Sequence, residues 1–77
     1  MNQLIKNYII ARTISKVRKE HGYSITDTAK HLDITDNELL LLESGEIEID
    51  CTVLVRLSHF FNVRVDDFFT ELKDLFI

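Results

Sequence analysis

Residues 24–45 read SITDTAKHLDITDNELLLLESG, a pattern typical of two short helices joined by a tight turn. Each helix is expected to start at a capping box, in which a hydroxyl residue and an acid three positions later bond each other's backbone amides. The two boxes are Ser24 with Asp27 and Thr35 with Glu38. Gly45 follows the second apolar run, where a left-handed glycine commonly ends a helix. Together these signals predict a helix-turn-helix.

Apolar residues inside this stretch recur at the three-residue spacing of one helix face. They are Ala29 and Leu32 in the first helix and Leu39 and Leu42 in the second. Because a helix has one core-facing side, Leu40 and Leu41 should project mostly outward. Two outward leucines form a candidate surface for a protein partner, and the alternative is that they cover the adjoining loop.

Residues 18–45 resemble the lambda repressor and Cro-type (XRE-like) helix-turn-helix family. The matching positions are Arg18, Gly22, Tyr23, Ser24, Ala29, Leu32, Ile34, Thr35, Leu39, Leu42, Glu43 and Gly45. The resemblance extends over about residues 10–70, because VLVRLSHFFNVRVDDFF also looks like that family's closing segment. It implies an all-α fold, a five-helix lambda-repressor-like DNA-binding domain. It also implies a structural ion pair between Arg18 and Glu43 that fixes the third helix against the first.

The composition agrees with an all-α domain, since the 77 residues include no Pro and only two Gly. We expect one domain over residues 1–77, with a first helix over about residues 2–21 that is longer than the family's usual one. The inward positions of this helix are predicted to be Ile10, Ala11, Ile14 and Val17. The C-terminal helices are expected over about residues 51–76, the fourth capped by Asp50 or Thr52 and the fifth starting around Asp66 and Asp67.

Apolar side chains at both ends of the chain exceed what one small core needs. They are Leu4, Ile5 and Tyr8 in the first helix and Leu72, Leu75 and Phe76 in the last. Such residues need a partner surface, so we expect them to pack against one another or to form the face of a homodimer.

Several classes of function are disfavoured by what the sequence lacks. The single Cys51 excludes an internal disulfide, and no Cys or His grouping has the spacing of a zinc site, so we expect neither metal nor cofactor. No nucleophile, base and orienting acid group by motif, which argues against an enzyme. No leader peptide or membrane-length apolar run is visible, so a reducing, cytoplasmic setting is expected.

Charge is distributed unevenly along the chain, whose net charge is -4. Residues 1–31 hold six bases and two acids, whereas residues 32–77 hold three bases and eleven acids. Residues 33–50 alone hold seven acids and no base. DNA phosphates repel such a segment, so the acidic run argues against ordinary duplex binding.

Three positions depart from the family pattern: Ile25 replaces the usual Gln, Thr28 a core Leu or Val, and Asp33 the turn Gly. Asp tolerates a left-handed backbone, so the turn should survive. In the third helix only Asn37 is an ordinary reader of base edges. If DNA is bound, we expect contacts from Thr35, Asp36, Asn37, Leu41, Ser44 and Lys16.

Two hypotheses of function follow. The first is a small transcriptional regulator that binds double-stranded operator DNA as a homodimer, which the family resemblance favours. The second is a helix-turn-helix used for protein contact through its acidic, leucine-rich third helix, as an antirepressor, a partner of another regulator or an acidic mimic of DNA. Fold alone does not decide between them.

Overall fold

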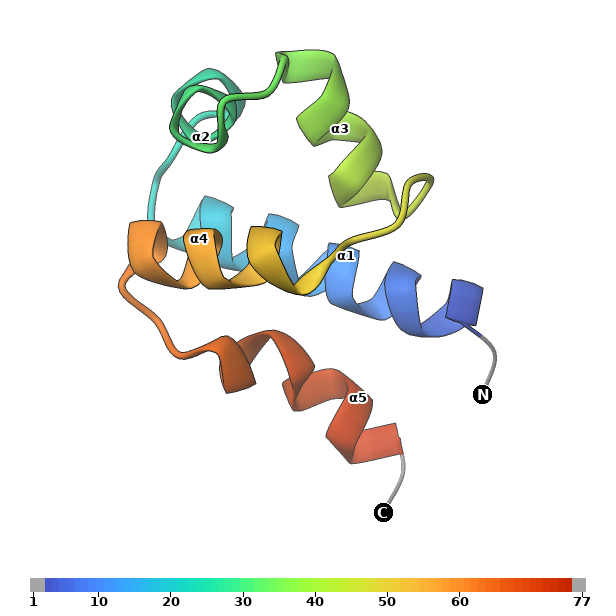
Figure 1. The fold of residues 1–77 in the computed structure, drawn as a ribbon. Helices are drawn as coiled ribbons and strands as arrows, with labels where there is room; N and C mark the ends of the chain where they lie inside the picture. The colour runs from blue at the N-terminus through green and yellow to red at the C-terminus, as the bar shows by residue number, and fades with distance from the viewer. Residues whose placement is uncertain (1–2, 76–77) are drawn as a thin grey trace.

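The computed structural model describes residues 3–75, with side chains from residue 5 to residue 72. The described residues form five α-helices and one short 3₁₀ helix and contain no strand (Figure 1). These elements are α1 (Gln3–Glu20), α2 (Ile25–Leu32), α3 (Asp36–Ser44), α4 (Cys51–Phe61), η1 (Val65–Phe69) and α5 (Thr70–Leu75). The predicted all-α, five-helix fold is therefore confirmed.

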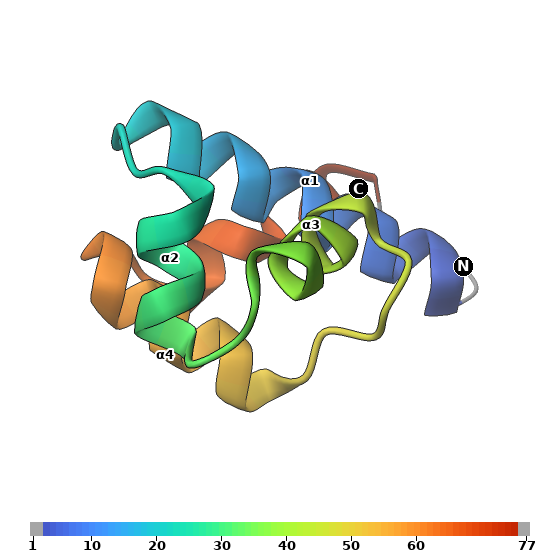
Figure 2. The same cartoon turned by 90° about the horizontal axis from the view of Figure 1, so that it is seen from above.

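The helices are arranged on two sides of a central pair. In Figure 1, α2 and α3 lie above α1 and α4, whereas α5 lies below them. Figure 2, viewed from above, shows α2 and α3 nearest the viewer, with no other element covering them. The helix-turn-helix is thus presented on one open face, which is called the α2–α3 face below. No helix in the described part of the chain is long and apolar enough to cross a membrane.

The hydrophobic core draws on α1, α2, α3, α4 and η1. Its members are Ile14, Ala29, Leu32, Leu39, Leu42, Leu54, Leu57, Phe61 and Phe68. Burial of these side chains supplies the main stabilising free energy of so small a domain, in which no disulfide is available. The inward positions predicted for α2 and α3 are all among them.

The core-facing stripe of α1 differs from the predicted one. Asn7, Ala11, Ile14 and Arg18 are buried along it, at i, i+4, i+7 and i+11, and Ile9 and Thr13 are buried beside it. The predicted residues Ile10 and Val17 are half-buried and pack against the core from its edge. This stripe faces α3 and the segment that follows it, because the polar side chains at its two ends bond there. The contact of α1 with α3 and the following segment is therefore apolar in its middle and has a polar side chain of α1 at each end.

The predicted caps form at the helix ends, although only one of the two predicted capping boxes has both of its bonds. Thr35 and Glu38 make both reciprocal bonds, whereas at the start of α2 the Ser24 hydroxyl accepts from the Asp27 amide without a return bond from Asp27. Asp50 caps α4 by accepting from the Val53 amide at 3.0 Å. Asp33 adopts a φ of 59°, so the left-handed turn persists without the family's glycine.

The last helical segment bears on the two alternatives predicted for Leu72. It begins as the 3₁₀ helix η1, in which the Arg64 amide donates to Asp67, and continues as α5. Phe68 and Leu72 are both buried within the chain, Leu72 with 7% of its surface exposed. Leu72 is therefore enclosed within the chain, in agreement with the alternative that the last helix packs against the first. Phe76 lies outside the described residues, as do the side chains of Leu4 and Leu75.

The two glycines offer a matched test of backbone geometry against close packing. Both have left-handed φ angles, 76° at Gly22 and 81° at Gly45. Gly22→Ala should lower the free energy of unfolding by about 1–2 kcal/mol, the cost of a left-handed Cβ. Gly45→Ala should cost more, because its Cβ would lie 3.1 Å from the Tyr8 Cα. Urea unfolding of both variants tests this, and equal losses would mean that α1 moves aside freely.

Candidate nucleic-acid interface

A buried ion pair joins α1 to α3 behind the α2–α3 face. The Arg18 Nε lies 2.6 Å from Glu43 Oε2, and the Nη2 atom donates to Oε1 at 3.1 Å. The two side chains are only 10% and 8% exposed, so the paired geometry is screened little by water. The side chains expected to pair do lie together, and they fix the last turn of α3 against α1.

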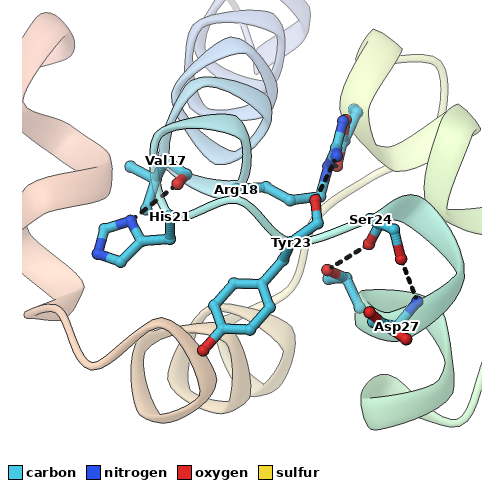
Figure 3. Close-up of polar contacts among 8 residues, drawn as sticks. Val17, Arg18, His21, Tyr23, Ser24 and Asp27 are labelled. Atoms are coloured by element: carbon cyan, nitrogen blue, oxygen red, sulfur yellow. Dashed lines mark hydrogen bonds and ion pairs between the residues drawn. The ribbon is translucent and has the colours of Figure 1, made fainter.

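The same guanidinium also holds the turn before α2. Its Nη1 atom donates to the Tyr23 carbonyl at 2.8 Å, as Figure 3 shows beside the Ser24 cap of α2. One side chain of α1 therefore holds both the start of α2 and the end of α3 in place. Displacing Arg18 would loosen both helices of the motif at once.

A second polar clasp holds the segment after α3. The Asn7 amide donates to the carbonyls of Gly45 and Ile47, at 3.2 and 2.8 Å, and its oxygen accepts from the Ile49 amide at 2.9 Å. Asn7 is buried, and it satisfies three backbone groups that no helix pairs. The extended N-terminal part of α1 thus orders the α3–α4 connection.

Most polar side chains at the start of α3 are bonded within the chain. Thr35 and Glu38 form the capping box. Asp36 accepts a 2.8 Å hydrogen bond from the Thr26 hydroxyl of α2, which links the first turns of the two helices. Acids in the first turn also interact favourably with the helix dipole. The side chains of Thr35, Asp36 and Glu38 are therefore all engaged in hydrogen bonds within the motif.

Asn37 differs from these neighbours. Its side chain is exposed on the first turn of α3 and makes no hydrogen bond within the described residues. An amide presents a donor and an acceptor together, which matches the edge of adenine in the major groove. Asn37 is therefore the uncommitted group on this turn that could read a base.

Two other residues of α3 that were predicted to make contacts, Ser44 and Leu41, are less available to a ligand than Asn37. The Ser44 hydroxyl lies 3.0 Å from both the Leu41 carbonyl and a Glu46 carboxylate oxygen, so its proton is engaged within the chain. Leu41 is half-buried, so it is covered more than its predicted outward position implies, although it is not among the side chains that pack against the core. Leu40 projects outward as expected, with 52% of its surface exposed.

Lys16 is not brought together with the start of α3. It lies on an exposed stripe of α1 with Arg12 and Lys19, and it lines a hollow shared with Glu43 of α3 and Glu71 of α5. The hollow lies at the end of α3 opposite Asn37. A phosphate contact from Lys16 would therefore lie at the edge of any interface centred on Asn37.

Sequence reasoning missed two positioning residues, Asn7 and Thr26. A signal for Asn7 exists, since it continues the buried spacing of Ala11, Ile14 and Arg18 toward the N-terminus. Thr26 carries no such signal, because its bond to Asp36 depends on the angle between two helices.

The comparison with known protein families agrees with this geometry. Residues 14–68, more than half of the chain, match the family described as Helix-turn-helix, HTH_3. The chain belongs to this family, and the match confirms the resemblance to the lambda repressor and Cro type. No curated protein matches the chain.

Solved structures with the same fold include two bacterial regulators. One is the clp gene regulator ClgR from C. glutamicum, 18% identical with a TM-score of 0.84, covering 100% of this chain and 97% of that chain. The other is an HTH_3 family transcriptional regulator from Vibrio cholerae, 22% identical with a TM-score of 0.82. That match covers 96% of this chain but 42% of the Vibrio protein, so this chain corresponds to less than half of it. At such identities the likeness shows the fold.

Proposed function

We propose that this chain is a transcriptional regulator of the XRE type that binds operator DNA as a dimer through its α2–α3 face. The observation that carries the proposal is the free Asn37 amide on the exposed first turn of α3, in the element that this family inserts into the major groove. The names of the two structural neighbours, both regulators, agree with it.

The acidic charge of this face shapes the expected mode of binding. No base occurs in residues 33–50, so phosphates must be held largely by backbone amides at helix N-termini and by bases at the edge of the face. Few counterions would then be released. We expect affinity to fall less steeply with salt than it does for a basic helix-turn-helix protein.

Selection from a random duplex library tests the proposal, followed by fluorescence anisotropy on the enriched duplex at several salt concentrations. Enrichment of a two-fold symmetric site would support it. Absence of enrichment from a folded sample, together with no binding at low salt, would overturn it.

Asn37→Ala is expected to weaken binding to the selected site by about 1–3 kcal/mol and to relax preference at one base pair per half-site, because a bidentate amide contact is lost. Anisotropy on the selected duplex and on its single-base variants measures both effects. His59→Ala, exposed on α4 and away from the α2–α3 face, is the control and should change neither. If Asn37→Ala keeps the full preference, another surface reads the DNA.

A second candidate function, contact with a basic protein partner, is favoured by the exposure of Leu40 between acids of α3. An apolar side chain among carboxylates suits the basic face of another regulator. Leu40→Asp should abolish such a complex and leave the fold intact, since Leu40 lies outside the core. Affinity capture with the wild-type chain and this variant measures the loss, and equal capture by both would remove α3 from the interface.

A further inference from the structure

A hollow of about 390 Å³ lies between α2 and α4 and has no assigned role. We call it the α2–α4 hollow. Three aromatic side chains and two charged ones line it: Tyr23, His31 and Phe60, with Asp27 and Lys30. Its volume is within the range of sites that bind small molecules. No residue of α3 is among the lining residues, so a ligand in the hollow would leave Asn37 accessible.

The three aromatic rings of the hollow are stacked, with Phe60 as the shared member. The centre of the Phe60 ring lies 4.5 Å from that of Tyr23 and 4.3 Å from that of His31, with interplanar angles of 35° and 20°. Figure 3 shows the Tyr23 ring extending from the turn before α2 toward α4. Tyr23 and Phe60 are only half-buried and His31 is exposed, so solvent reaches the stack. A further aromatic ring could pack against it in the same way.

The two charged side chains of the hollow have opposite signs and no partners. Asp27 and Lys30 are three residues apart on α2, so they lie on one side of that helix with their Cβ atoms about 5–6 Å apart. Both are exposed, and neither side chain makes a hydrogen bond or an ion pair within the described residues. An unpaired carboxylate and an unpaired ammonium group therefore lie beside the aromatic stack.

The charges restrict the class of ligand. Asp27 disfavours a purely anionic ligand, and Lys30 disfavours a purely cationic one. A free α-amino acid carries an ammonium and a carboxylate on one carbon atom, so it can pair with both side chains at once by charge-assisted hydrogen bonds. An aromatic side chain on the same molecule would reach the rings.

We propose that the α2–α4 hollow binds an aromatic α-amino acid. Its ring packs against Phe60 and the rings stacked on it, its ammonium group donates to the Asp27 carboxylate, and its carboxylate accepts from Lys30. The inference goes beyond the proposed function, and its test does not depend on DNA binding.

The hollow adjoins the contacts that hold the start of α2. The Tyr23 carbonyl accepts from Arg18 at 2.8 Å, and the Asp27 amide donates to the Ser24 hydroxyl at 3.0 Å. A ligand that joins Asp27 to Phe60 would therefore stabilise α2 in the orientation that Arg18 sets. Because such a ligand binds the folded chain, it should also raise the midpoint of urea unfolding.

Amide NMR spectra of the full chain, titrated with L-phenylalanine, L-tyrosine or L-tryptophan, test the proposal. The titrations extend to about 10 mM, because a ligand of this size on an open surface is expected to bind with a Kd of about 1 mM. The largest shifts should occur at the amides of the five lining residues. The absence of such shifts with all three amino acids would overturn the proposal.

Three analogues of L-phenylalanine separate the contributions of its groups. L-Alanine lacks the ring, 3-phenylpropionate lacks the ammonium group, and 2-phenylethylamine lacks the carboxylate. Each should bind at least about tenfold more weakly, because one set of contacts is lost. If both single-charge analogues bind as tightly as L-phenylalanine, Asp27 and Lys30 do not hold the ligand and the assigned class is wrong.

Substitutions in the chain give a matched measurement. Asp27→Asn and Lys30→Gln remove one charge at nearly constant size, and each should weaken binding about tenfold while circular dichroism stays unchanged. Lys19→Gln makes the same change as Lys30→Gln at an exposed base of α1 and should leave the affinity as it is. Wild-type affinity in both hollow variants would overturn the proposal.

Discussion

Arg18→Ala is expected to lower the free energy of unfolding by about 3–5 kcal/mol, the usual cost of removing one partner of a buried ion pair. The substitution deletes both bonds to Glu43 and the bond to the Tyr23 carbonyl. It leaves the Glu43 carboxylate, which is only 8% exposed beside Arg18, without the charge that it is bonded to. Urea unfolding followed by circular dichroism measures the loss.

Two further variants separate the ion pair from general effects on α1. Lys19→Ala changes an exposed base on the adjacent position and should alter stability by less than about 0.5 kcal/mol. The double variant Arg18→Met, Glu43→Leu should recover much of the loss, because apolar groups of similar volume leave no buried charge unpaired. An Arg18→Ala protein as stable as the wild type would show that Glu43 reaches water without its partner.

The helix-turn-helix was predictable because its signals are local. The Thr35–Glu38 box, the Asp50 cap and the left-handed Gly45 each involve bonds between residues at most four apart, which sequence spacing reveals directly. The inward leucines of α3 follow from helical periodicity. The one distant contact predicted correctly, between Arg18 and Glu43, came from the family resemblance.

Features missed by sequence reasoning depend on contacts between distant segments. Asn7 bonds backbone atoms 38 to 42 residues away, and backbone atoms carry no residue-specific signal. The burial of Leu72 agrees with one of the two alternatives that the sequence left open, and the choice depends on how α5 returns to α1, which apolar composition does not determine. An apolar side chain near a chain end looks the same in sequence whether it covers its own core or a second copy.

The acids of α3 present the main conflict between family and composition, and the structure reduces it. Glu43 is neutralised by Arg18, Glu38 caps the helix, and Asp36 accepts from Thr26. These three carboxylates are accounted for by the stability of the motif. Their presence is therefore weaker evidence against DNA binding than the count of acids suggests, although their charge still disfavours phosphate contacts along α3.

Asn7→Asp is expected to destabilise the chain by at least as much as Asn7→Ala, for which we expect about 2–4 kcal/mol. Alanine leaves two carbonyls and one amide of the α3–α4 connection without their partner, and each such group costs about 1–3 kcal/mol when water cannot replace it. Aspartate keeps the acceptor for the Ile49 amide but loses the donor. Its carboxylate would face the Gly45 and Ile47 carbonyls, which now lie 3.2 and 2.8 Å from the amide nitrogen.

The chain offers a matched control for this substitution. Asn37→Asp makes the same chemical change at an exposed residue without hydrogen bonds in the described structure, so urea unfolding should show a change below about 0.5 kcal/mol. If Asn7→Asp proves as mild as Asn37→Asp, water must replace the amide in the clasp. The N-terminal part of α1 would then contribute little to the order of the α3–α4 connection.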